Sequence, residues 1–369
     1  MTRYFFLLLL LLGPITLLAQ KRATRSINMA ELEQKISIPA WMPPPSATSS
    51  TNPGNYQRIE TGCDSIVLTR QSEIDSFTIL HPGCTTVRKL IVNGQGASPA
   101  ITSLDSLKYI TNITEEFTIT YTSVASLSVL PNLVQIGTLF QLTYNPLLTS
   151  IGLNNITQLG EIIFRVNPLL NSIAGLSNNI DTIGGVLLDT ASLTSLSGLS
   201  GIVHINGPLA IRNTPLSNLS SLSSLASING PLRLENISTL TSIGLTGLEQ
   251  AAAFLFSDLT SLTTLAGLTN SLTNTSIGTF WMINTGITNF TGFDSLTSVV
   301  NFYIWLNPNL TSLQGLQNLS GNVQQGISMW GNNALTNITA LSNITSLSAG
   351  ELDLHGNNLL SDLTGLGNI

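Results

Sequence analysis

A unit of 22–25 residues recurs from Ile101 to the last residue and constrains the fold more than any other feature of the chain. Eleven units are complete, and the twelfth stops halfway. A unit this short cannot bury its own apolar face, so neighbouring units must stack into a solenoid with a shared core. The units begin at Ile101, Val124, Leu148, Leu170, Leu193, Leu216, Leu240, Leu262, Ile287, Leu310, Leu335 and Leu360.

Each unit combines two hydrophobic periods. In the first half, illustrated by NPNLTSLQGLQNLS at residues 307–320, leucine returns at every third position. That spacing fits neither a helical face nor a half-buried strand and predicts a coil that turns corners around the core. In the second half, pairs such as Leu209 and Ile211 alternate with other residues, which predicts a short strand. We therefore expect a mainly β chain, a parallel β-solenoid of about 12 rungs.

Asparagines follow the predicted strands in many units. Their amides are suited to satisfying backbone groups at a turn, so we interpret them as scaffold residues and not as ligands. The group comprises Asn145, Asn167, Asn213, Asn236, Asn284, Asn307, Asn332 and Asn357.

The N-terminal 19 residues contain an early positive charge, a leucine-rich run and a small-residue site before Gln20, as in a signal peptide. The alternative, a membrane anchor, is disfavoured because the apolar run is short and no second run follows. Residues 20–61 form a Pro/Ser-rich linker that we expect to be disordered. The mature chain is thus predicted to be secreted, without a transmembrane segment.

An exported chain reaches an oxidising compartment, where an even number of cysteines predicts disulfide formation. Cys63 and Cys84 are the chain's 2 cysteines, so we expect them to pair and to stabilise the fold by about 3 kcal/mol in the loop-entropy model. Two thiols and scattered histidines do not suggest a metal site, and no cofactor is predicted.

The chain resembles the leucine-rich-repeat and receptor L-domain superfamily, and in particular secreted surface proteins of Bacteroidetes-type bacteria. The resemblance covers about residues 62–369, through GCDSIVLTRQSEIDSF, HPGCTTVRKLIV and the LTSLxGL units. It implies a right-handed solenoid at 101–369, whose first rung is covered by an N-terminal cap at 62–100 stapled by the disulfide. Members of that group commonly end in a C-terminal sorting domain, which this sequence does not show, so surface attachment is in doubt.

The acidic excess of the repeats argues against nucleic-acid partners. From Ile101 onward, four basic residues stand against thirteen acidic ones, and such a surface repels phosphate backbones. We therefore expect no nucleic-acid binding.

Aligned units place four charged residues of alternating sign in one column, directly after the second inward position of the strand. These are Arg165, Asp189, Arg212 and Glu235. As a catalytic centre they would form a carboxylate pair held by arginines. The structural interpretation, which we favour, is that alternation keeps like charges apart on neighbouring strands.

In later units the same column and its neighbour become aromatic, and their positions are predicted to point outward. An exposed aromatic ladder suits stacking on sugar rings or a protein hot spot, whereas the alternative is that the rings only shield the sheet. The candidate ligand-binding residues are Trp281, Tyr303, Trp305, Trp330 and His355.

No catalytic motif occurs in the sequence, so we predict a secreted or cell-surface, non-enzymatic repeat protein for adhesion or for recognition of a glycan or protein. A rigid sheet that displays side chains in fixed columns would bind with little loss of entropy. The alternatives are a β-solenoid carbohydrate-active enzyme built around the charge column, and a purely structural surface component.

Overall fold

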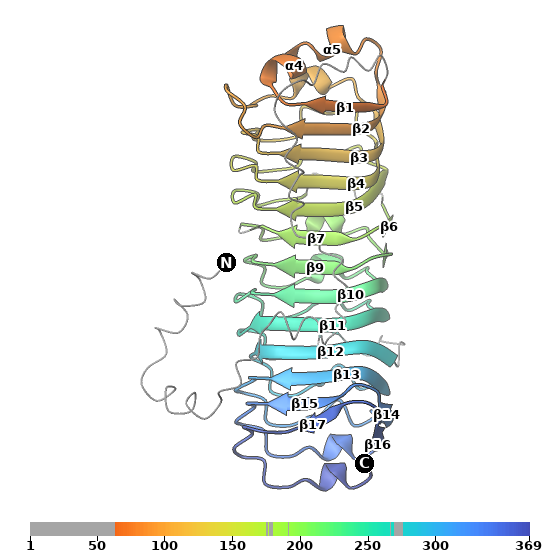
Figure 1. Cartoon of the computed structure of the whole chain (residues 1–369), viewed down its shortest axis with the longest axis vertical. Coiled ribbons are helices and arrows are strands. Elements are labelled where there is room, and N and C mark those ends of the chain that lie inside the picture. Colours follow the sequence, from red (N-terminus) through yellow and green to blue (C-terminus); the bar gives the residue numbers. More distant parts are fainter. Residues whose placement is uncertain (1–62, 175, 177–179, 191, 266, 269–275) are drawn as a thin grey trace, which may run out of the picture. The chain divides into compact units, whose positions relative to one another are not determined.

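Figure 1 shows the computed structural model of the chain, which describes residues 63–174, 176, 180–190, 192–265, 267–268 and 276–369. The signal peptide predicted at 1–19 and the linker predicted at 20–61 lie outside the described residues. The cap and the repeats belong to one structural unit, which spans residues 61–369.

Parallel strands from successive repeats pair side by side in chain order and form a 15-stranded sheet (Figure 1). The prediction of a mainly β parallel solenoid of about 12 turns is confirmed. The path of the sheet is β1 (Ser65–Leu68), β2 (Thr86–Asn93), β3 (Asn112–Thr120), β4 (Gln135–Thr143), β5 (Gln158–Arg165), β7 (Val186–Asp189), β9 (Leu209–Arg212), β10 (Ser227–Glu235), β11 (Gln250–Leu259), β12 (Ser276–Thr285), β13 (Ser298–Trp305), β15 (Gly326–Trp330) and β17 (Glu351–Asp353).

Four short strands lie off this path. Strands β6 (Thr182–Ile183) and β8 (His204–Ile205) pair with each other, and β8 also pairs with β10. Strands β14 (Gly321–Val323) and β16 (Ile344–Leu347) form a separate 2-stranded sheet.

The three-residue leucine spacing has a specific backbone cause. Leu316 N–H donates to the Leu313 carbonyl and Leu319 N–H to the Leu316 carbonyl, both at 3.1 Å. These i→i+3 bonds are of the 3₁₀ type, in which residues three apart lie on the same face. Leu310, Leu313, Leu316 and Leu319 are accordingly no more than 1% exposed. The predicted corner-turning segment is thus a series of 3₁₀-type turns, which are long enough to count as helices at η1 (Asp105–Leu107), η2 (Ser197–Leu199), η3 (Ser220–Leu222), η4 (Thr339–Leu341) and η5 (Thr364–Leu366).

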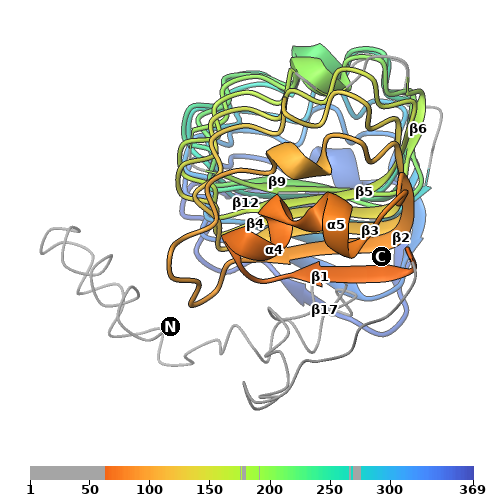
Figure 2. The same cartoon turned by 90° about the horizontal axis from the view of Figure 1, so that it is seen from above.

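Helices α4 (Gln71–Asp75) and α5 (Phe77–Leu80) cover the N-terminal end of the stack (Figure 2). Ile74 and Phe77 are buried there. The Gln71 side-chain oxygen accepts hydrogen bonds from the backbone N–H groups of Thr102, at 2.9 Å, and Ser103, at 3.1 Å, which ties the helices to the first repeat. The predicted Cys63–Cys84 disulfide is confirmed, with the two Cα atoms 5.5 Å apart.

One group of asparagines forms a buried ladder along the stack. The Asn307 side chain accepts from Thr285 N–H at 2.9 Å and donates to the Met282 carbonyl at 3.0 Å, while its own backbone N–H donates to Asn332 Oδ1. Each amide thereby satisfies backbone groups of the neighbouring rung, as predicted. The members of this ladder are Asn145, Asn167, Asn307, Asn332 and Asn357.

Asn213, Asn236 and Asn284 occupy a different position. The prediction that their amides satisfy backbone groups is wrong for them, because each donates to a side-chain oxygen of the preceding rung. Their φ angles are 54°, 52° and 51°, in the left-handed region that Asn tolerates better than most residues. These residues lie one position before the ladder position in the repeat. Asparagine is favoured there because the backbone has a positive φ angle. The alignment of the repeats did not separate these two roles because the positions are adjacent in the chain and both lie near the end of a strand.

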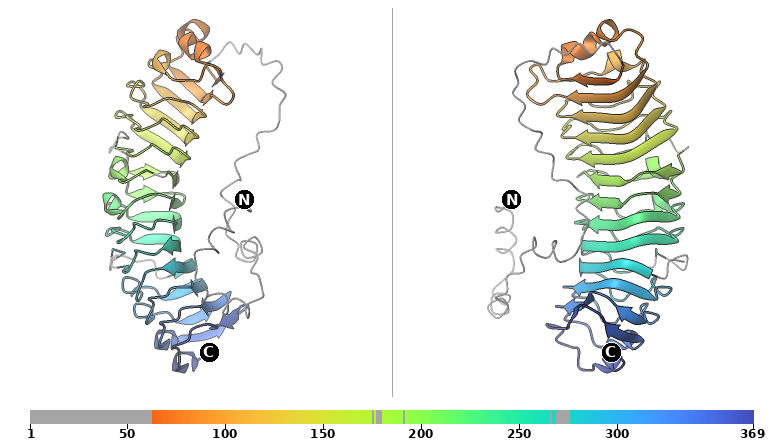
Figure 3. Two further views of the ribbon diagram at one scale, coloured as in Figure 1. Left: turned by 90° about the vertical axis from the view of Figure 1, so that its left-hand side faces the viewer. Right: turned by 45° about the vertical axis from the view of Figure 1, so that its right-hand side comes forward.

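The sheet lies on the concave side of the repeat unit, and the turns and 3₁₀ segments lie on its convex side (Figure 3). Alternate strand residues point into the core, and those between them form the surface that we call the outer face of the sheet.

Candidate ligand-binding face

The outer face carries two columns that contain the predicted site residues, with one residue contributed by each strand. The strand register fixes both columns, because paired Cα positions place side chains of successive rungs about 4.8 Å apart. The inner column runs through Leu187, Ala210, Arg233, Leu255, Trp281, Tyr303, Ser328 and Asp353. The outer column runs through Arg165, Asp189, Arg212, Glu235, Ser257, Ile283, Trp305 and Trp330.

The structure places the four predicted charged residues on adjacent strands, but they do not form a continuous ion-pair ladder. Arg212 Nε donates to Asp189 Oδ2 at 2.9 Å. Glu235 pairs with Arg233 of its own strand, whose Nε lies 2.6 Å from Glu235 Oε1. Arg165 Nε is buried and lacks a hydrogen-bond partner within the described part of the chain. The two carboxylates are therefore held by arginines of different columns, Asp189 by Arg212 in the outer column and Glu235 by Arg233 in the inner column.

This arrangement favours a structural role for the charge column. Asp189 also accepts from Asn213 Nδ2 at 2.7 Å, so both of its oxygens are engaged. A general acid or base must exchange a proton with a substrate within hydrogen-bond reach. Asp189, whose two oxygens already accept from an arginine and an amide, is poorly suited to that task.

The aromatic residues cluster on the outer face of β12, β13 and β15. Ring centroids of Trp281 and Trp305 are 6.0 Å apart, and those of Tyr303 and Trp305 are 5.5 Å apart. Trp305 Nε1 donates to Ser328 Oγ at 2.8 Å. The Trp330 ring contacts His355 at a centroid distance of 5.4 Å. We call Trp281, Tyr303, Trp305, Trp330 and His355 the aromatic cluster.

The prediction of an exposed ladder is wrong for two members of the aromatic cluster. Trp281 and Trp305 are only 9% and 8% exposed, although they lie outside the inner core. Rings wider than the spacing between strands fold over one another and bury their faces. Tyr303 and Trp330 stay half-buried, and His355 is exposed, so the surface accessible to a ligand is the C-terminal edge of the cluster.

The interior of the cluster contains unsatisfied polar atoms. Trp281 Nε1 is buried without a hydrogen-bond partner among the described residues, and so is the Asn301 side-chain oxygen on the adjacent strand. Burial also raises the pKa of the Tyr303 hydroxyl above its ordinary value.

A groove at the N-terminal ends of the strands was not predicted from the sequence. The groove has a volume of about 480 Å³ and is lined by residues of β4, β5, β6 and the segment after β8, including Glu161. The only signal in the sequence was the set of glycines near Gly160 and Gly184, which does not by itself indicate a groove. Across the described ranges, no cluster of three or more His, Cys, Asp or Glu residues could hold a metal ion. No helix within those ranges is long and apolar enough to cross a membrane.

Comparison with known proteins adds little to this geometry. No protein-family model matches the chain, and no curated protein sequence matches it either. A crystal structure of an internalin from Listeria monocytogenes str. 4b F2365 is 18% identical, over 79% of this chain and 87% of that one, with a TM-score of 0.35. A similarity at this level carries no argument about function, so the assignment of a leucine-rich parallel solenoid rests on the repeats and the sheet described above.

Proposed function

We propose that the chain is a secreted or cell-surface, non-enzymatic recognition protein that binds an extracellular glycan or protein on the outer face of its sheet. The observation that carries the proposal is the aromatic cluster, which gathers four large rings and a histidine at one end of that face. Half-buried aromatic side chains on a rigid support are typical of binding hot spots and of sugar-stacking platforms. The disulfide and the predicted signal peptide support export.

The rigidity of the sheet supports recognition without conformational change. Parallel pairing on both sides holds β12 and β13, and the ring contacts restrict the rotamers of Trp281 and Trp305. A surface ordered before binding loses little conformational entropy when the ligand arrives.

The test is a screen of the full chain on immobilised oligosaccharides and in a cell-adhesion assay, followed by the double variant Tyr303→Ala with Trp330→Ala. We expect the variant to lose at least about tenfold in affinity, because aromatic hot spots typically contribute that much. Tyr109→Ala is the matched control, since this tyrosine is 53% exposed and lies away from the cluster. Binding that survives the double variant would show that the cluster is not the site.

The enzymatic alternative has its own readout. A polysaccharide hydrolase or lyase would release new reducing ends or unsaturated products from plant or algal polysaccharides. We expect none from the wild-type chain, and activity that disappears in Asp189→Asn would overturn the proposal.

A further inference from the structure

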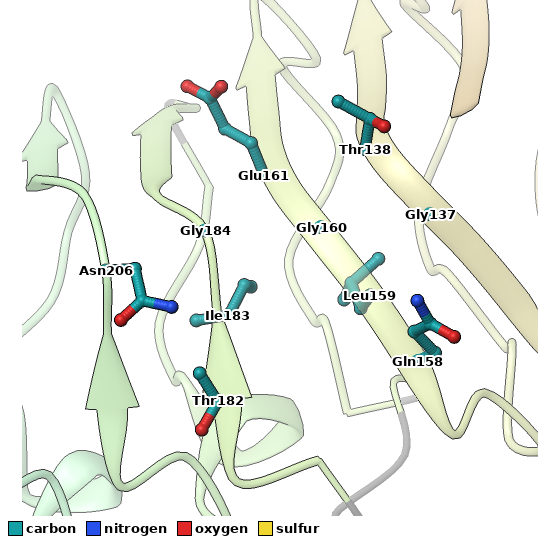
Figure 4. A pocket seen from close by; sticks show the side chains of 10 residues that line it. All are labelled: Gly137, Thr138, Gln158, Leu159, Gly160, Glu161, Thr182, Ile183, Gly184 and Asn206. Carbon is teal, nitrogen blue, oxygen red and sulfur yellow. The ribbon is translucent and has the colours of Figure 1, made fainter. Parts of the chain in front are cut away.

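The groove at Glu161 exists because two strands are interrupted beside it. Strand β6 ends at Ile183 and β7 begins at Val186, and β8 and β9 are separated in the same way. Gly184 and Gly185 fill the first interruption and place no side chain against β5. Figure 4 shows Gln158 and Glu161 along one strand and Asn206 on another, with the segment of Thr182, Ile183 and Gly184 between the two strands.

Gly185 keeps the space next to Glu161 free of a side chain. A Cβ atom at Gly185 would make a tight contact with Pro208 Cδ at 3.3 Å and an ordinary one with Glu161 Cγ at 3.6 Å. At Gly137 and Gly160, in contrast, a Cβ atom would collide with a backbone carbonyl of the neighbouring strand. The inter-strand packing therefore requires glycine at Gly137 and Gly160, which line the groove, whereas a Cβ atom at Gly185, which adjoins the lining, would require only a small shift of Pro208.

The polar side chains that line the groove are largely unused. Thr138, Gln158, Glu161 and Thr182 make no side-chain hydrogen bond within the described residues, while Asn206 accepts one from Asn229 at 3.3 Å. Threonines elsewhere on the solenoid are engaged: the Thr149 and Thr157 hydroxyls donate to carbonyls of the preceding rung. The groove thus retains donors and acceptors that a ligand can use.

Glu161 differs from the paired carboxylates of the sheet because no cation lies beside it among the described residues. Glu116 lies 3.4 Å from Lys89, Asp189 pairs with Arg212, and Glu235 pairs with Arg233. The residues next to Glu161 on the flanking strands are Leu139 and Gly185, which are uncharged, and the next charge on its own strand is Arg165 in the outer column. Burial raises the pKa of the Glu161 carboxyl above its ordinary value.

We propose that this groove binds an amino sugar, whose ammonium group pairs with Glu161 and whose hydroxyls bond to Thr138, Gln158, Thr182 and Asn206. A half-buried carboxylate without a partner is unfavourable unless a ligand supplies the missing charge. The groove has a volume of about 480 Å³ and is shallow and open to solvent, so the ligand would bind at the surface of the sheet. The chain's net charge of −6 attracts a cationic ligand.

The lining selects a sugar over a lysine side chain of a protein partner. A lysine would satisfy Glu161 alone and leave the amide and hydroxyl groups of the groove without partners. An amino sugar presents an ammonium group and several hydroxyls on one ring and can engage both kinds of group. This site is separate from the aromatic cluster and does not depend on it.

The test is titration calorimetry of the full chain at pH 6 with a β-1,4-linked glucosamine tetramer. We expect saturable binding that weakens at least tenfold in Glu161→Gln, which is isosteric but lacks the charge. Glu116→Gln is the matched control, because it removes a carboxylate of the same sheet that already has a cation, and it should leave affinity unchanged. Trp330→Ala should also bind the tetramer normally, which separates this site from the aromatic cluster.

Two further probes define the ligand class. The N-acetylated tetramer keeps the hydroxyls but lacks the ammonium group, and Nα-acetyl-lysine methylamide keeps the ammonium group but lacks the hydroxyls. Each should bind at least tenfold more weakly than the glucosamine tetramer. The proposal is overturned by absent saturable binding of the glucosamine tetramer, by unchanged affinity in Glu161→Gln, or by equal binding of either probe.

Discussion

The outer face of the sheet has a charged stretch toward its N-terminal end and an aromatic stretch toward its C-terminal end. Asp189 and Arg212 in the charged stretch are partly exposed, whereas Trp281 and Trp305 in the aromatic stretch are buried. Asp189 and Glu235 each pair with one arginine, whereas the rings form an apolar cluster outside the core. Equivalent strand positions in a solenoid can therefore be stabilised by ion pairs in one region and by aromatic packing in another, because each position contacts mainly the neighbouring repeats.

The largest expected effect comes from breaking the aromatic end. Trp305→Ala should lower the free energy of unfolding by about 3 kcal/mol, because it removes a buried ring that packs on two others. Urea denaturation followed by circular dichroism measures the change. Tyr109→Ala should change stability little, and a loss in Trp305→Ala no larger than in this control would show that the cluster does not stabilise the sheet.

A smaller effect is expected in the charged stretch. Arg212→Met should cost about 1–2 kcal/mol, between the values for surface and buried ion pairs, because Asp189 retains only its bond from Asn213. The exchange Asp189→Arg with Arg212→Asp restores the pair and should recover at least half of the loss. If the exchange is as unstable as Arg212→Met, the pair does not account for the effect.

Trp330, at the accessible edge of the aromatic cluster, should contribute little to the free energy of unfolding even if it binds a ligand. Trp330→Ala removes a half-buried ring whose contact is with the exposed His355, so we expect a loss below about 1 kcal/mol. The same denaturation measurement tests this expectation. A loss equal to that of Trp305→Ala would mean that Trp330 belongs to the structural part of the cluster and is not free to serve as a binding residue.

The smallest effect distinguishes Glu161 from the paired carboxylates by its pH dependence. Because the pKa of Glu161 is raised in the folded state, its ionised form opposes folding at neutral pH. Glu161→Gln should therefore be slightly more stable than wild type at pH 7, and the difference should vanish as pH falls below the ordinary pKa of glutamate. Melting temperatures of wild type and Glu161→Gln between pH 3 and 7 test this sign.

Much of the fold could be predicted from the sequence because it depends on period and composition. The repeat length sets the rung, the alternate apolar residues set the strand and its inward side, and two cysteines in a chain predicted to be exported allow one disulfide. Leu310 and its partners at every third residue were predicted correctly as core residues, and the structure adds that 3₁₀-type turns place them there.

The candidate site was predictable in position but not in character. Repeat alignment placed Trp281, Trp305 and Trp330 on the outer face, yet it could not show that the first two bury each other, because that depends on ring orientations across strands. The two asparagine roles differ in a φ angle that the residue type does not specify. The groove was not predicted because it depends on strand interruptions in neighbouring rungs.

The sequence by itself determined the stacked architecture, since a short repeat with this apolar spacing has no other way to bury its leucines. Only the tertiary structure decided which outward side chains remain available to a ligand. The reason is geometric. Strands lie about 4.8 Å apart, so large side chains on neighbouring strands cover one another. Glu161, by contrast, lies next to a glycine and has no partner among the described residues.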